Sequence, residues 1–199
     1  MKLYYSPGAC SLSPHIVLRE LGQKFDLVKV DLATKKTESG ADYKSINPFG
    51  YVPALDVDGQ VLTEGPAIVQ YLADKAGKLA PANGTLERYR LQQWLNFTTS
   101  ELHKGMGSLF NKDLAAKAGD IVKERLALRL QVLDNHLKGK DFILGKEYSV
   151  VDAYVFTVLG WAKFVDVDLS KYANIGAYLG RVGARPAVQA ALKAEGLVK

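Results

Sequence analysis

Residues 2–15 read Lys-Leu-Tyr-Tyr-Ser-Pro-Gly-Ala-Cys-Ser-Leu-Ser-Pro-His, and this stretch decides the fold. Its apolar start is strand-like and leads through the turn-forming pair Pro7-Gly8 to a cysteine. A helix follows, for which Ser13 before Pro14 is the expected N-cap residue. The sequence therefore predicts that Cys10 lies between a first strand and a first helix.

Strand and helix signals continue to alternate through the first 80 residues. Phe25 to Asp31 alternates like a strand, which completes a βαβ unit with parallel pairing. Two further strand patterns, 54–57 and 60–63, flank Asp58-Gly59, a strong two-residue hairpin turn. A helix begins after Glu64-Gly65-Pro66 and runs to about residue 75. The order βαβ followed by ββα predicts an α/β domain over residues 1–78.

The second half of the chain has a different character. Residues 79–85 belong to a Gly-, Pro- and Asn-rich stretch typical of a linker. Residues 86–199 show apolar faces at helical spacing and predict an all-α domain of about five helices. The expected helices span residues 86–110, 118–137, 150–165, 175–183 and 187–194, and Ser149 with Asp152 resembles a capping box at the start of the third.

Composition excludes several classes of protein. The 199 residues carry 26 Lys and Arg against 21 Asp and Glu, and 48% are hydrophobic, enough for a sizeable core. The basic excess lies in residues 81–199, but it is spread between acidic residues, and no nucleic-acid signature, P-loop or dinucleotide pattern occurs. We find no membrane span or signal-peptide core, so we expect a cytoplasmic protein that binds neither nucleic acid nor membrane.

Cys10 is the only cysteine, which rules out an internal disulfide and a Cys-rich metal site. A thiol beside the N-terminus of a helix typically has a lowered pKa and is partly thiolate near neutrality. Free cysteines are more often small buried hydrophobes, but the neighbours of Cys10 are polar and turn-forming. We therefore expect a reactive thiol that can form a mixed disulfide with an external thiol.

Two further segments of the α/β domain are candidates for peptide binding. If the Val52-Pro53 bond is cis, the backbone of Val52 is free to pair with an extended peptide; the alternative is an ordinary trans proline at an edge strand. Glu64 and Gly65 stand at a helix N-terminus, where free N–H groups accept a carboxylate and Glu64 can take an ammonium group. Simple capping of the helix also explains an acidic residue there.

In the helical half, Trp94 to Lys104 forms a helical stretch in which Asn96, Ser100, His103 and Lys104 mostly share one face. An amide, a hydroxyl, an imidazole and a cation on one face suit a polar ligand. A solvated surface with a structural histidine is the alternative.

These segments together resemble the bacterial beta-class glutathione transferases, members of the cytosolic glutathione S-transferase superfamily. The resemblance is carried by the segments quoted above and continues through Val151-Asp152-Ala153-Tyr154 to the terminal residues 194–199, so it covers nearly the whole chain. It implies a thioredoxin-like N-terminal domain, an all-α C-terminal domain, a homodimer and a site for glutathione as co-substrate, with no metal.

The resemblance also implies a role for each candidate residue. Cys10 would lie at the glutathione sulfur, and His103 would approach it as a second catalytic residue. Lys35 would meet the glycyl end, Val52 before cis-Pro53 the cysteinyl backbone, and Glu64 with Gly65 the γ-glutamyl end. Asn96, Ser100 and Lys104 would line the same cleft. Other classes use a Tyr or Ser near the first strand, so Tyr4, Tyr5, Ser6 or Ser11 remain alternatives for activating the thiol.

We therefore expect an enzyme that conjugates glutathione to small hydrophobic electrophiles, such as halogenated aromatics, in detoxification. A glutaredoxin-like thiol transferase and a non-catalytic glutathione-transferase-like binding protein are the alternatives. Leu109, Phe110, Trp161 and Phe164 are candidates for an electrophile pocket, although ordinary core packing explains them equally well. The sequence does not identify the electrophile.

Overall fold

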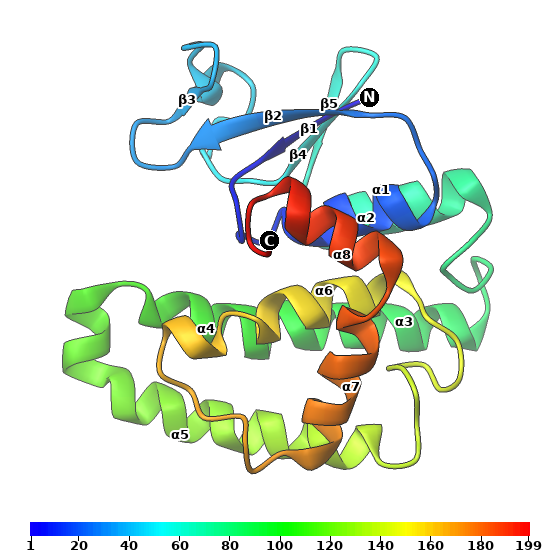
Figure 1. The fold of residues 1–199 in the computed structure, drawn as a ribbon, viewed down its shortest axis with the longest axis vertical. Coiled ribbons are helices and arrows are strands. Elements are labelled where there is room, and N and C mark those ends of the chain that lie inside the picture. Colours follow the sequence, from blue (N-terminus) through cyan, green and yellow to red (C-terminus); the bar gives the residue numbers. More distant parts are fainter. The chain divides into compact units, whose positions relative to one another are not determined.

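The computed structural model of the chain describes residues 1–199, which form two compact units (Figure 1). The first unit contains Met1–Ala80 together with Ala184–Lys199, and the second contains Pro81–Gly183. None of the helices combines the length and the apolar character that a membrane crossing requires.

A five-stranded mixed sheet forms the centre of the first unit, in the order β3-β2-β1-β4-β5. β1 pairs with β2 in parallel, which confirms the βαβ unit, and the remaining pairs are antiparallel. The predicted hairpin is confirmed, whereas the short strand β3 was not expected. The strands are β1 (Lys2–Tyr5), β2 (Asp26–Asp31), β3 (Lys36–Thr37), β4 (Ala54–Val57) and β5 (Gln60–Thr63).

Helices α1 (Leu12–Glu20) and α2 (Gly65–Ala76) contact each other on one side of this sheet (Figure 1). The predicted N-cap of α1 is wrong, because the helix begins at Leu12 and Ser11 is the cap residue. Ser13 lies inside the first turn, and its hydroxyl donates to the Cys10 carbonyl at 3.0 Å. The helix starts earlier than Pro14 because the turn that contains Cys10 winds directly into it.

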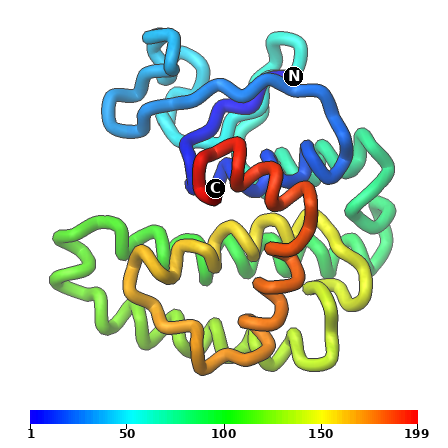
Figure 2. The backbone as a smooth tube through the Cα atoms, in the orientation of Figure 1, coloured from blue at the N-terminus to red at the C-terminus, as the bar shows by residue number.

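The C-terminal helix α8 (Pro186–Ala194) packs against α1, so the last segment of the chain belongs to the first unit (Figure 2). Arg185 forms a two-pronged ion pair with Glu20, at 2.6 and 2.9 Å. The sequence assigned residues 184–199 to the helical domain. These residues contact α1 instead, because Arg185 pairs with Glu20 of α1 and the apolar face of α8 packs against the same helix.

The second unit is entirely helical. Its helices are α3 (Leu86–Phe97), a π-helix (Thr98–His103), α4 (Lys104–Leu109), α5 (Lys112–Leu137), α6 (Val150–Leu159), a 3₁₀ turn (Ala162–Phe164) and α7 (Ala173–Gly183). The single helix expected over residues 86–110 is thus three segments, and the helix expected to reach residue 165 ends at Leu159. α6 begins at Val150 as predicted, and the Asp152 carboxylate accepts the Ser149 N–H at 2.8 Å.

Candidate active site

Cys10 occupies a tight turn between β1 and α1. Backbone hydrogen bonds build the turn, from Ala9 N–H to Ser6 O at 3.0 Å and from Leu12 N–H to Ala9 O at 3.0 Å. The residue as a whole is half-buried, and its thiol donates to the carbonyl oxygen of Val52 at 3.1 Å. The structure therefore brings together two of the predicted site residues, 42 positions apart in the chain.

The expected lowering of the Cys10 pKa is wrong for the ligand-free protein. Burial raises the pKa of the thiol to about 12, and the charge on Glu64 adds to the rise. The N–H groups of Cys10 and Ser11 act in the opposite direction but do not outweigh burial. The first N–H groups of α1 are engaged elsewhere, because Ser13 N–H donates to the Cys10 carbonyl. Cys10 is a neutral thiol at neutral pH.

The Val52-Pro53 peptide bond is cis, as the peptide-binding prediction required. Both side-chain packing and hydrogen bonds to the backbone hold this segment in place. Val52 is buried in a cluster with Tyr4 and Tyr43, and the carbonyl of Tyr51 accepts hydrogen bonds from Tyr43 Oη at 2.9 Å and from an amide side chain at 2.7 Å. The backbone beside Cys10 is thus held by its own core contacts.

Glu64 and Gly65 begin α2 next to this segment. Glu64 is exposed, has a φ of 65°, and does not cap the helix with its side chain. A positive φ at a non-glycine residue is uncommon and frequently marks a functional site. A Cβ at Gly65 would lie 3.8 Å from Pro53 and 3.9 Å from the Ser13 hydroxyl, so the start of α2 lies against the cis-proline and the start of α1.

Lys35 lies in the turn between β2 and β3, and its side chain reaches the loop that precedes Val52. Its Nζ donates to Gly50 O at 3.0 Å and lies 5.3 Å from the centre of the Tyr51 ring. The structure thus gives the cation a fixed position within the first unit, with the side chain half-buried.

The hydroxyl alternatives to Cys10 differ in their surroundings. Ser11 is fully buried, and its hydroxyl both accepts from Ser6 N–H at 3.2 Å and contacts Ser6 O at 3.3 Å. Tyr4 is buried and its ring contacts Tyr43. Burial together with the charge on Glu195 raises the pKa of Tyr5. Ser11 and Tyr4 serve the fold, and Tyr5 is a poor source of a phenolate.

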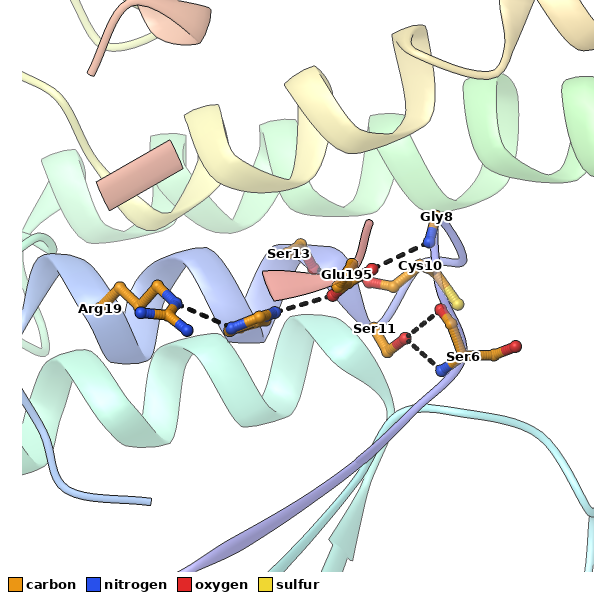
Figure 3. A network of polar contacts seen from close by, with 8 residues as sticks. Ser6, Gly8, Cys10, Ser11, Ser13, Arg19 and Glu195 are labelled. Atoms are coloured by element: carbon orange, nitrogen blue, oxygen red, sulfur yellow. Dashed lines mark hydrogen bonds and ion pairs between the residues drawn. The ribbon is translucent and has the colours of Figure 1, made fainter. Parts of the chain in front are cut away.

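A buried network that the motif analysis did not assign supports the Cys10 turn from behind (Figure 3). The Glu195 carboxylate accepts from Gly8 N–H at 2.8 Å and contacts His15 Nδ1 at 2.7 Å, and Arg19 Nε–H donates to His15 Nε2 at 2.8 Å. The side chains of His15 and Glu195 are both fully buried. The C-terminal segment therefore fixes the turn that carries the thiol.

Gly8 is required at its place in this turn. Its φ is +72°, and an added Cβ would lie 3.4 Å from the side chain of Leu197. The sequence signal for this network was present in the terminal residues quoted with the family resemblance. Periodicity alone could not reveal their partner, 187 positions away.

In the second unit, His103 ends the π-helix and is half-buried. Its Nδ1 lies 2.6 Å from the Tyr154 hydroxyl, and its ring meets the Trp161 ring edge-on at 4.8 Å between centres. Burial lowers the pKa of His103 to about 4, with a smaller contribution from Lys104. The imidazole is therefore neutral at pH 7.

Asn96, Ser100 and Lys104 are exposed, so their side chains are available to a ligand. The π-helix that begins after Phe97 changes the register of this face. Three consecutive hydroxyls, from Thr98 to Ser100, donate to carbonyls four residues earlier at 2.7 to 3.0 Å. Such back-bonding disturbs helices, and π-turns are frequent at functional sites. In the sequence, the run of three hydroxyl residues was the signal from which this π-helix could have been predicted.

The four candidates for an electrophile pocket are divided by the structure. Trp161 is buried and contacts both His103 and Phe110, the latter at 5.9 Å between ring centres. Phe110 is half-exposed, while Leu109 is a core residue. Phe164 is exposed beneath the Lys163 cation. His103, Trp161 and Phe110 thus form one aromatic group, which we call the His103 cluster.

Comparison with known proteins agrees with this architecture. The family models for the glutathione S-transferase N-terminal and C-terminal domains match residues 1–74 and 97–186. Glutathione S-transferase GstA of Escherichia coli O157:H7 is 48% identical over 99% of this chain and 100% of its own. The chain belongs to the glutathione S-transferase family, in which it is a beta-class glutathione transferase.

Two solved structures illustrate the likeness. A sphingomonad glutathione S-transferase, in complex with glutathione, is 50% identical with a TM-score of 0.94 over 100% of both chains. The beta-class glutathione S-transferase of Sphingomonas chungbukensis is 52% identical with a TM-score of 0.94, again over 100% of both chains. The predicted family, the thioredoxin-like first domain and the helical second domain are confirmed.

Proposed function

We propose that the chain binds glutathione beside Cys10 and joins it, through its sulfur atom, to a small apolar electrophile. The observation that carries this proposal is the contact between the Cys10 thiol and the Val52 carbonyl, next to a cis-proline and the start of α2. A neutral thiol, the backbone beside a cis-proline and a helix N-terminus are the groups that a cysteine-containing peptide with a free α-carboxylate needs. Glutathione bound to the sphingomonad relative supports the same ligand.

The three ends of glutathione are proposed to meet different groups. Lys35 pairs with the glycyl carboxylate, and the backbone of Val52 before Pro53 pairs with the cysteinyl residue. Glu64 takes the γ-glutamyl ammonium while Gly65 N–H receives the neighbouring carboxylate. The positive φ of Glu64 and its unengaged cap role support this assignment.

From the helical unit, we propose that Asn96, Ser100, His103 and Lys104 also bind glutathione. Their exposure supports roles for the amide, the hydroxyl and the cation, and the neutral, half-buried imidazole supports the role of His103. The His103 cluster supplies the apolar surface for the electrophile. With an activated aryl halide, the glutathione thiolate forms a bond to the ring carbon, and the halide leaves with the electron pair of the carbon–halogen bond.

Cys10 has two proposed roles. As a neutral thiol it donates a hydrogen bond to the glutathione thiolate in place of the Val52 carbonyl, which stabilises the anion. It also forms a mixed disulfide. In that step Cys10 loses its proton to solvent and attacks one sulfur of oxidised glutathione. The new bond joins Cys10 to that sulfur, and the other glutathione leaves as a thiolate.

Binding calorimetry with reduced glutathione, combined with a conjugation assay on 1-chloro-2,4-dinitrobenzene, tests the proposal. We expect Glu64→Gln to weaken glutathione binding about tenfold or more, because the amide cannot pair with an ammonium group. Glu87→Gln, at an exposed acidic residue of α3, is the matched control and should bind normally. Turnover of a glutathione mixed disulfide that far exceeds conjugation would favour a thiol transferase. Failure to bind glutathione at all would favour a non-catalytic binding protein.

We further propose that the enzyme works as a cytoplasmic homodimer in detoxification, as the cytosolic members of the family imply. Exposed apolar residues on α5, namely Leu114, Ile121 and Leu128 at seven-residue intervals, support a subunit interface there. Sedimentation of an Ile121→Glu, Leu128→Glu double variant should give a monomer. The exposed Val61→Glu in β5 is the control, and a double variant that stays dimeric would refute this interface.

A further inference from the structure

The Tyr154 hydroxyl forms a short hydrogen bond with His103 Nδ1, and the direction of this hydrogen bond determines which imidazole nitrogen carries the proton. A phenol O–H is a more acidic hydrogen-bond donor than the N–H of a neutral imidazole, and the unprotonated imidazole nitrogen is a more basic acceptor than a phenol oxygen. The distance from Tyr154 Oη to His103 Nδ1 is 2.6 Å. In this contact Tyr154 is therefore the preferred donor and Nδ1 the preferred acceptor.

Thr99 is a second possible acceptor for the Tyr154 proton, and it is the weaker one because of its distance. Thr99 Oγ1 lies 3.4 Å from Tyr154 Oη, which is longer than O–H donors usually span. The Thr99 proton is already donated to the Leu95 carbonyl at 2.9 Å, since a carbonyl only accepts. Tyr154 is 2% exposed, and burial within the core fixes its hydroxyl in place.

We infer that Tyr154 is a positioning residue that fixes the tautomer of His103, with the proton on Nε2. In a neutral imidazole one nitrogen donates and the other accepts, so an Nδ1 that accepts leaves Nε2–H as a donor. Burial keeps the ring neutral at pH 7. The edge-on contacts with Trp161 and Tyr154 fix the ring plane, and Gly107 leaves room beside Cδ2, the carbon next to Nε2.

This tautomer decides what His103 does in the proposed reaction, and that consequence rests on the proposed function. An imidazole with Nε2–H has no lone pair on that nitrogen, so it does not take the thiol proton as a base. It donates a hydrogen bond to the glutathione thiolate and to the negative charge that remains near the sulfur. His103 is thus a stabiliser of the anion, and Tyr154 sets that role through Nδ1.

The other two histidines provide references of both kinds in the same protein. His15 Nε2 accepts from Arg19 Nε–H, so its proton lies on Nδ1 and points to Glu195. His136 Nε2 lies 2.7 Å from the Ile143 carbonyl, so its proton lies on Nε2. His103 is expected to match His136 and to differ from His15.

Two-dimensional ¹H–¹⁵N spectra of histidine-labelled, ligand-free protein at pH 7 read these tautomers directly. We expect the Nε2–H pattern for His103, a mixture of tautomers in Tyr154→Phe, and no change in Tyr172→Phe, a control that also removes a buried hydroxyl bonded to a carbonyl. Thr99→Val should leave the pattern unchanged. An Nδ1–H pattern in the wild type, or a Tyr154→Phe variant with unaltered tautomers, would overturn the inference.

Steady-state kinetics distinguish a positioning role of Tyr154 from a purely structural one. If glutathione binds as proposed, Tyr154→Phe should lower kcat for conjugation about five-fold, the effect of one typical hydrogen bond, with little change in KM for glutathione. Tyr172→Phe should keep both values. A Tyr154→Phe variant with unchanged kcat would overturn the role of the tautomer in the reaction. If glutathione does not bind, only the proposed function fails, because the spectra need no ligand.

Discussion

Replacement of Glu195 by Gln tests the network that supports the Cys10 turn. Both partners of the carboxylate donate hydrogen bonds to it, Gly8 through its N–H and His15 through Nδ1–H. An amide has one accepting oxygen and one donating nitrogen. One of the two donors therefore loses its acceptor on residue 195 and faces the amide NH₂ group instead. A buried unsatisfied donor costs about 1 to 3 kcal/mol, and we expect a loss of about 2 kcal/mol in the free energy of unfolding.

Urea unfolding followed by circular dichroism measures this loss, which should appear as a lower midpoint at an unchanged slope. Glu147→Gln, at an exposed acidic residue, is the matched control and should stay within about 0.5 kcal/mol of wild type. The loosened turn should also increase the rate at which Cys10 is alkylated by iodoacetamide. A Glu195→Gln protein as stable as the control, with unchanged Cys10 alkylation, would refute the reasoning.

Three further predictions follow from the buried groups. The pKa of Cys10, about 12, predicts that alkylation of the ligand-free thiol accelerates about tenfold per pH unit from pH 6 to 9, and a plateau below pH 8 would contradict this. The pKa of His103 lies near 4 in the folded protein, below its usual 6.5, so the unfolded chain takes up the proton first as the pH falls. Stability is then lost below pH 6.5, by at most about 2 kcal/mol between pH 7 and 5, and urea titrations of His103→Gln should lack this loss. Asp152→Ala removes the acceptor of the buried N–H groups of Ile143 and Ser149, and should cost about 3 kcal/mol or more by the same urea assay; a cost below about 1 kcal/mol would contradict it.

Local sequence signals predicted the elements that depend on neighbouring residues. The hairpin of β4 and β5 has its predicted bounds, because Asp58-Gly59 dictates a two-residue turn whatever surrounds it. The start of α6 at Val150 was equally local. The βαβ pairing and the helical character of the second half followed from period and order alone.

The features that sequence patterns missed depend on distant partners. α8 lies in the first unit because Glu195 and Arg185 find His15, Gly8 and Glu20 there, and no periodicity shows this. The pKa of Cys10 was predicted with the wrong sign, since burial by the surrounding chain outweighs the two nearby N–H groups. The π-helix arises from hydroxyl groups that compete for backbone carbonyls.

The central claim is that Cys10 lies at the glutathione sulfur. Intact mass spectrometry after incubation with oxidised glutathione, on wild type beside Cys10→Ala, tests it most directly. The account predicts one glutathione adduct on wild type, removed by reductant, absent from Cys10→Ala, and formed faster at pH 9 than at pH 7. No adduct on wild type at either pH, from a protein that still binds glutathione, would contradict it.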